Sequence, residues 1–255
     1  MVETSGGAVD RVWLSQRPGQ LLRYLVCQRG RAVPADQIVQ ALWPGGDVGA
    51  GENVRYLVHL LRRRLEPQRP PRGESHSVEC LGGAYALAQG VWIDAQAFEE
   101  LVDGASTAAD DDEHDVALSR LDRALDLYRG DFLSDEPYAD WAMAERERMR
   151  GMAEDALRAA AGVCQQRHDF GRALEYARSL AEMGCYDSDV QLQVISLCLR
   201  CGRRSEAARR YDAFRARLRR EFGVEPEFDL AVASGVSLSP ALAPPLRPLA
   251  ASRAR

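Results

Sequence analysis

The stretch that decides the fold is GENVRYLVHLLRRRL, residues 51–65. At about 100° of rotation per residue, its larger apolar side chains fall within about 60° of Val54 on one face of a helix. These apolar residues are Leu57, Val58, Leu61 and Leu65. The pattern predicts an amphipathic helix that buries this stripe and turns its remaining side chains outward.

The outward face of this helix has the composition of a DNA-reading surface. A helix fits the major groove, where arginine pairs with guanine O6 and N7 while flanking arginines bind phosphates. For this helix taken alone, a solvated charged face is the alternative. The polar residues concerned are Arg55, Tyr56, His59 and Arg63, with Arg62 at the edge of the face.

The neighbouring segments predict two more helices and a hairpin. Helical spacing of leucine and valine indicates a helix over residues 17–29, which Gly30 ends, and a shorter helix over residues 36–43. Apolar residues that alternate with other residues on both sides of Gly82-Gly83 predict a β-hairpin after the third helix. Before the first helix, Arg11–Leu14 is expected to be a strand.

This part of the chain resembles the winged-helix output domain of the OmpR/PhoB type, as it occurs in AfsR/SARP regulators. The resemblance covers residues 17–90 and rests on RAVPADQIVQALWP (31–44), NVRYLVHLLRRRLEP (53–67) and VECLGGAYALA (78–88). It implies that the third helix enters the major groove and that the hairpin, the wing, lies along the adjacent DNA backbone or minor groove. The DNA-binding residues that we predict are Arg55, Tyr56, His59, Arg62, Arg63, Gly82, Gly83 and Tyr85.

The rest of the chain predicts helices only. A shift of 34 residues pairs Cys164 with Cys198 and Ala173 with Ala207, and 34 residues is the tetratricopeptide period. Such repeats stack and leave a concave surface for a protein or peptide. The expected helices cover residues 95–104, 113–128, 138–150, 152–168, 171–183, 187–201 and 204–222.

This second half resembles the bacterial transcriptional activator domain of the AfsR/SARP group. The resemblance spans residues 91–228 and rests on VWIDAQAFEELV (91–102) and on YRGDFL (128–133) followed by PYADWA (137–142). We expect the aromatic residues of these motifs to be core residues that hold the first helices against the repeats. They are Tyr128, Phe132, Tyr138 and Trp141.

The charge distribution separates the two halves. Residues 1–90 carry 11 arginines and 8 acids, whereas residues 91–235 carry 19 arginines and 30 acids. The chain has no lysine, which suits phosphate and guanine recognition but is equally explained by genomic base composition. We therefore expect a mainly α protein with three parts: a winged helix-turn-helix domain (1–90), a tetratricopeptide-like helical domain (91–235) and a disordered tail (236–255).

The function that follows is a sequence-specific DNA-binding transcriptional regulator, and an activator by resemblance. Its expected partners are double-stranded DNA, RNA polymerase subunits or another regulator at the helical domain, and a second copy on DNA. The alternative is a protein-binding adaptor whose winged helix has lost DNA binding and uses Tyr56 and Leu60 in a protein interface. We identify no catalytic motif, cofactor loop or metal-ligand set, and expect a cytoplasmic protein without a membrane segment.

Overall fold

The computed structural model describes residues 2–4, 7–45, 50–70, 73–184 and 187–235, without the side chains of residues 50–52. The chain divides into two compact units, and each is treated by itself. The first contains residues 1–97 and 130–149, and the second contains residues 98–129 and 150–255. The expected disordered tail, residues 236–255, lies outside the described residues, and a domain boundary at residue 90 stays a prediction.

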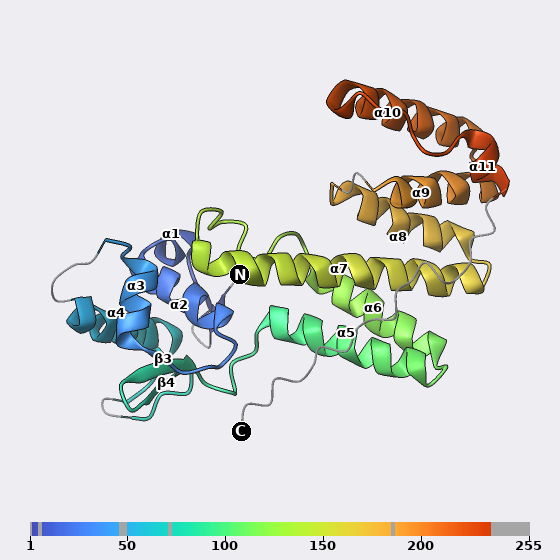
Figure 1. Cartoon of the computed structure of the whole chain (residues 1–255). Helices are drawn as coiled ribbons and strands as arrows, with labels where there is room; N and C mark the ends of the chain where they lie inside the picture. Colours follow the sequence, from blue (N-terminus) through green and yellow to red (C-terminus); the bar gives the residue numbers. More distant parts are fainter. Residues whose placement is uncertain (1, 5–6, 46–49, 71–72, 185–186, 236–255) are drawn as a thin grey trace. The chain divides into compact units, whose positions relative to one another are not determined.

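The first unit is a winged helix (Figure 1). Its main helices are α2 (Arg17–Cys27), α3 (Ala35–Leu42) and α4 (Ala50–Leu65), which confirms the three expected helices within two residues at each end. The predicted hairpin consists of β4 (Val78–Leu81) and β5 (Ala84–Leu87). A short strand that the sequence did not reveal, β3 (Val33–Pro34), pairs with β5 and gives the antiparallel order β3-β5-β4.

The core of the first unit lies between these helices and the sheet. Leu21 and Leu25 of α2, Ile38 of α3, and Val54 and Leu61 of α4 are all buried to within one per cent of completeness. Removing each of these side chains from water contributes about 1.5–3 kcal/mol, so these core residues together account for much of the stability of the unit. The buried stripe predicted for residues 51–65 is therefore confirmed.

The chain before α2 differs from expectation. Arg11–Leu14 forms a short helix, α1, and not a strand, because the Asp10 carboxylate accepts a hydrogen bond from the Val12 amide at 3.0 Å and so caps a helical turn. A small hairpin precedes it, in which β1 (Glu3–Thr4) pairs with β2 (Gly7–Ala8).

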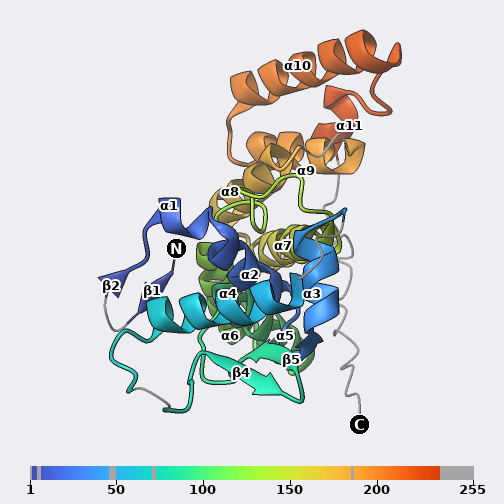
Figure 2. The ribbon, with the colours of Figure 1, turned by 90° about the vertical axis from the view of Figure 1, so that its left-hand side faces the viewer.

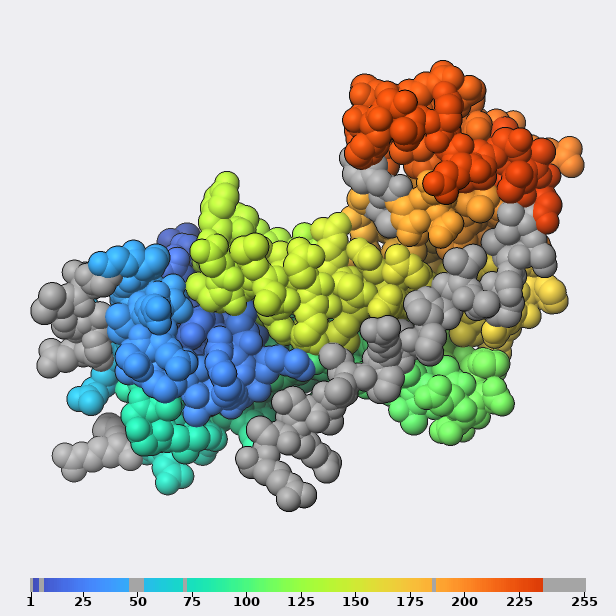
Figure 3. Space-filling view, in the orientation of Figure 1, coloured from blue at the N-terminus to red at the C-terminus, as the bar shows by residue number. Residues whose placement is uncertain are grey.

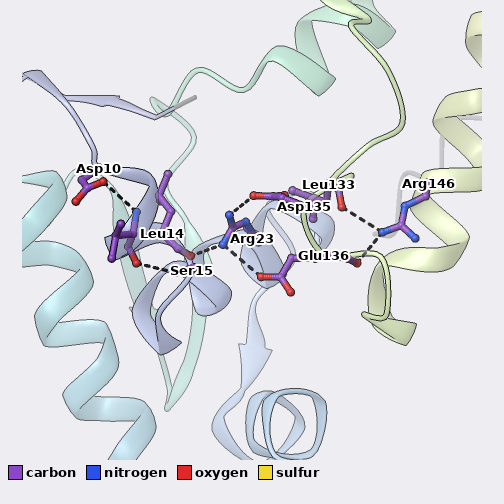
Figure 4. A network of polar contacts seen from close by, with 9 residues as sticks. Asp10, Leu14, Ser15, Arg23, Leu133, Asp135, Glu136 and Arg146 are labelled. Atoms are coloured by element: carbon purple, nitrogen blue, oxygen red, sulfur yellow. Dashed lines mark hydrogen bonds and ion pairs between the residues drawn. The ribbon is translucent and has the colours of Figure 1, made fainter.

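Residues 130–149 pack with the winged helix, although they lie far along the chain. In Figure 3 they form the yellow-green surface against the blue residues of the first helices. Trp141 meets Tyr24 of α2 edge to face, with ring centroids 5.5 Å apart. Arg23 of α2 donates to the Leu14 carbonyl and forms ion pairs with Asp135 and Glu136 (Figure 4).

The loop that carries these acids is ordered by Arg146. Its guanidinium donates to the carbonyl oxygens of Phe132 at 3.0 Å, Leu133 at 3.2 Å and Glu136 at 2.9 Å. One side chain thus binds several carbonyls of the loop, two of which, those of Leu133 and Glu136, also accept from backbone amides of its turns. We call residues 131–139 the strap, since Arg146 shapes this segment and Arg23 fastens it to α2 (Figure 4).

The expected core role of four aromatic residues holds only in part. Trp141 is half-buried and packs against the core of the first unit, and Tyr128 meets Phe98 in the second unit at 5.8 Å between ring centroids. Tyr138, however, is 95% exposed, so its assignment to a core is wrong. It lies on the strap, with its ring in solvent.

The described residues of the second unit form helices joined by turns and loops, without a strand. It comprises most of α5 (Asp94–Asp110) and α7 (Asp140–Gln166), together with α6 (His114–Leu127), α8 (Phe170–Glu182), α9 (Ser188–Arg200), α10 (Arg204–Phe222) and α11 (Leu230–Gly235). The expected division into helices 138–150 and 152–168 is wrong, because α7 is continuous through Gly151. A single glycine costs a helix about 1 kcal/mol and does not end it.

The 34-residue repeat corresponds to equivalent buried positions. Cys164 of α7 and Cys198 of α9 are both buried, as are Ala173 of α8 and Ala207 of α10. Charged pairs also join helices that are one repeat apart, among them Arg178 of α8 with Glu206 of α10. The predicted tetratricopeptide-like repeat is thereby confirmed.

The last helix, α11, escaped the sequence analysis. It packs on α9, where the buried Ser196 hydroxyl donates to the Ala233 carbonyl at 2.9 Å. Phe228, just before α11, stacks on Phe214 of α10. Over the described parts of the chain, none of the helices combines the length and the apolar content that crossing a bilayer requires.

Candidate nucleic-acid interface

The outward face of α4 is exposed as predicted. Arg55, Tyr56, His59 and Arg63 are all exposed, and Tyr56 retains 61% of its surface. Because Val54, Leu57, Val58 and Leu61 are buried on the opposite side, the helix cannot rotate without taking its core stripe into water. The buried stripe therefore fixes which side chains a ligand of this helix would meet.

Arg62 is placed differently from its neighbours. Its Nε and Nη2 donate to the carbonyl oxygen of Val78, at 3.1 and 2.8 Å, and the side chain is half-buried. Val78 is the first residue of β4, so this arginine links α4 to the wing. Its predicted role as a DNA contact stays a prediction, but the guanidinium is already engaged within the protein.

Glu66, one helical turn after Arg62, holds the segment that leads into the wing. Its Oε1 accepts hydrogen bonds from the Ser75 hydroxyl, the His76 amide, and the amide and hydroxyl of Ser77, all at 2.6–2.8 Å. Arg69 forms an ion pair with Oε2 at 2.9 Å. Burial favours a higher pKa for this carboxyl, but the hydrogen bonds from Ser77 and Ser75 outweigh it and lower the pKa below its ordinary value.

The wing is a two-residue hairpin. Leu81 pairs with Ala84, and the residues between them, Gly82 and Gly83, have φ of +59° and +89°. A type I′ turn needs positive φ at both central positions, which explains the paired glycines. Their backbone, with no side chain over it, is the part of the wing that a phosphate could approach most closely.

Tyr85 supports the wing from inside. It is only 7% exposed and belongs to the core of the first unit, and its backbone is paired with both Val33 of β3 and Cys80 of β4. It therefore shapes the wing but presents almost no surface to a ligand. Of the eight predicted DNA-binding residues, the structure brings four together on the outer face of α4 and puts two at the wing turn, while Arg62 and Tyr85 point into the protein.

The outer surface of the wing is not basic. Residues 78–88 contain no arginine, and the exposed side chains of β4 are Glu79, Cys80 and Leu81, the last retaining 56% of its surface. Among the described residues, the positive charge of the candidate interface therefore comes from α4 and not from the wing strands. Arg64, exposed in the last turn of α4, was missed by the sequence analysis, although it continues the same arginine run and could have been included on that ground.

The exposed basic face of α4, the wing beside it and the helical repeats define a DNA-binding transcriptional regulator of the winged-helix class. Residues 93–233 match the bacterial transcriptional activator domain, and the chain belongs to that family. Residues 9–77 match the family described as transcriptional regulatory protein, C terminal. The expected resemblance to AfsR/SARP-type regulators is thus confirmed.

One relative and one solved structure are similar to this chain. Regulatory protein DnrI of Streptomyces peucetius is 27% identical over 230 residues, which cover 84% of this chain and 80% of that protein. The solved structure titled "Mycobacterium tuberculosis EmbR in complex with low affinity phosphopeptide" superposes with a TM-score of 0.67 at 22% identity. It has the same fold over 86% of this chain, which spans 58% of the length of that one.

Proposed function

We propose that this regulator places α4 in the major groove of double-stranded DNA and reads base edges and phosphates with Arg55, Tyr56, His59 and Arg63. Gly82 and Gly83 approach the adjacent backbone through their amide groups. The observation that carries the proposal is the exposed face of α4, which presents cationic and hydrogen-bonding side chains while the opposite face is locked in the core.

A salt titration of DNA affinity tests this assignment. Sites are first selected from a random DNA pool, and binding is then measured by fluorescence anisotropy at several salt concentrations. Each phosphate that the protein neutralises contributes about −0.9 to the slope of log affinity against log salt, so Arg63→Ala is expected to reduce the slope by about 0.9. Arg209→Ala, at an exposed position on α10, is the matched control and leaves the slope unchanged.

An affinity that ignored both salt and the Arg63 substitution would contradict DNA binding by this face. It would favour the adaptor function, in which Tyr56 and Leu60 meet a protein. Tyr56→Ala would then weaken the protein complex, whereas under the DNA proposal it weakens DNA binding and alters the selected sequence.

We further propose that the helical repeats bind a protein partner, RNA polymerase subunits or another regulator, and that two copies occupy neighbouring sites on cytoplasmic DNA. Stacked helical hairpins support the first statement, because they present extended surfaces for protein. Binding of the full chain to purified polymerase, and stepwise shifts on DNA carrying one or two selected sites, test the two statements separately. A complex on paired sites with the same mobility as the complex on one site would contradict the second.

A further inference from the structure

The wing depends on α4 for its position. β4 is an edge strand, since the sheet order is β3-β5-β4, and β4 is joined to the rest of the unit through β5 on one side only. Figure 2 shows α4 alongside β4 and β5. The side chains that link this helix to the first residues of the wing are Arg62 and Glu66, which are one turn apart and so lie on the same face of α4.

The Val78 carbonyl needs a partner that the sheet does not provide. Val78 is paired with Leu87, and the flanking bond from the Ala88 amide to the Ser77 carbonyl marks Val78–Leu87 as a non-hydrogen-bonded pair. The backbone groups of Val78 therefore point away from β5. The amide donates to the Ser75 hydroxyl at 3.2 Å, and the carbonyl receives both donors of Arg62.

Glu66 completes this arrangement on the other side of Val78. It holds Ser75, His76 and Ser77, the three residues that precede β4, through four hydrogen bonds to one carboxylate oxygen. The same helix thus fixes both the approach to the wing and its first carbonyl. Since the wing contains no basic side chain of its own, its contribution to DNA binding depends on where its backbone is held.

We propose that Arg62 is a positioning residue, whose guanidinium fixes the wing against α4 and does not neutralise a DNA phosphate. The inference rests on the proposed function, since it concerns how the DNA-binding surface is assembled. It separates the three consecutive arginines of α4 into two kinds: Arg63 and Arg64 are exposed and face solvent, whereas Arg62 is half-buried and acts as a hydrogen-bond donor to Val78.

The chemistry of glutamine allows charge and hydrogen bonding at Arg62 to be tested separately. In both arginine and glutamine a nitrogen donor is attached to Cδ, so Arg62→Gln keeps a donor where Nε lies, 3.1 Å from the Val78 oxygen, and removes the charge. Arg62→Met keeps the length of the stem and removes the donor. Arg63→Gln removes the same charge from an exposed position and is the matched control.

The expected result is that the salt slope of Arg62→Gln equals that of the wild type, while Arg63→Gln loses about 0.9. Arg62→Met is expected to weaken DNA binding about tenfold without a change of slope, and to lose hydroxyl-radical protection on the wing side of the site. Arg62→Gln is expected to keep most of the wild-type affinity and most of the hydroxyl-radical protection on the wing side. A loss of slope in Arg62→Gln equal to that in Arg63→Gln would overturn the proposal, because it would make Arg62 a phosphate contact.

Hydrogen exchange without DNA distinguishes failure of this inference from failure of the proposed function. In the full chain, Arg62→Met is expected to accelerate amide exchange in residues 78–87, and Arg62→Gln to leave it near the wild-type rate. If the wild type binds no DNA but this pattern holds, the positioning role stands and the DNA-binding function falls. Wild-type exchange rates in Arg62→Met would overturn the positioning role whatever the DNA result.

Discussion

Replacement of Arg23 by methionine measures how much the strap contributes to the winged helix. The side chain of Arg23 is only 12% exposed, and the substitution keeps its apolar stem while it removes the bond to Leu14 and the ion pairs with Asp135 and Glu136. The Glu136 side chain is 20% exposed, so its pair is partly shielded from water, whereas Asp135 is 60% exposed and contributes little.

The loss of stability expected for Arg23→Met follows from these three contacts. A hydrogen bond from a charged donor contributes about 1.5–3 kcal/mol, and the loss of Arg23 also leaves the Leu14 carbonyl and Glu136 without a partner. We add about 1 kcal/mol for the shielded pair and nothing for the exposed one, so the first unit is expected to lose about 3 kcal/mol. For a domain of this size that corresponds to a decrease in Tm of about 10 °C.

Tryptophan fluorescence is the suitable assay, because all four tryptophans lie in the first unit and the second contains none. Its thermal transition therefore reports on the winged helix and the strap alone. Arg31→Met is the matched control, since Arg31 is exposed and its bond to Gln28 is at the surface. If Arg23→Met and Arg31→Met melted within about 2 °C of each other, the stabilising role of the strap would be refuted.

Three further predictions concern the first unit. Gly19→Ala is expected to lower the free energy of unfolding by about 2–4 kcal/mol, because a Cβ would lie 2.0 Å from the Leu14 carbonyl oxygen; an unchanged urea midpoint would contradict this. The fold lowers the pKa of the Glu66 carboxyl, so the ionised carboxylate stabilises the folded state fully at neutral pH. This stabilisation is lost as the pH falls through the folded-state pKa. Glu66→Gln should therefore destabilise by about 2 kcal/mol at pH 7 and progressively less in acid, measured by urea titration, and a pH-independent loss would be the contrary outcome. Burial raises the pKa of Cys27 to about 12, so mass spectrometry should find that iodoacetamide labels the exposed Cys80 at pH 8 well before Cys27, and equal rates would be inconsistent with the structure.

Local periodicity was sufficient to predict α2, α3, α4, the wing hairpin and the outer face of α4. It did not predict α1, the single helix α7 or α11. The apolar stripe of residues 51–65 determined which side of α4 is buried, and so the exposure of Arg55, Tyr56, His59 and Arg63. The two glycines of the wing were recognisable because a tight hairpin requires positive φ at both positions. These features depend on neighbours within a few residues, which a single sequence displays directly.

The remaining features depend on tertiary contacts that no local pattern reveals. Arg62 lies at the edge of the polar face in projection, and its partner is a backbone carbonyl left free by an edge strand. Tyr85 fits the alternating pattern of a hairpin strand, but its side chain is buried in the core of the first unit. Tyr138 belongs to an aromatic motif, yet its ring lies in solvent on the strap.

Attachment of the strap to α2 limits how regulators of this class can be recombined. A chimera joined at residue 90 would exchange Arg23 and Tyr24 but retain the recipient's own residues 130–149. The foreign winged helix would then face acids and an aromatic ring selected for a different surface. A design that transfers residues 130–149 together with residues 1–97 keeps these contacts intact, and should give more soluble and more active hybrids than one cut at the apparent linker.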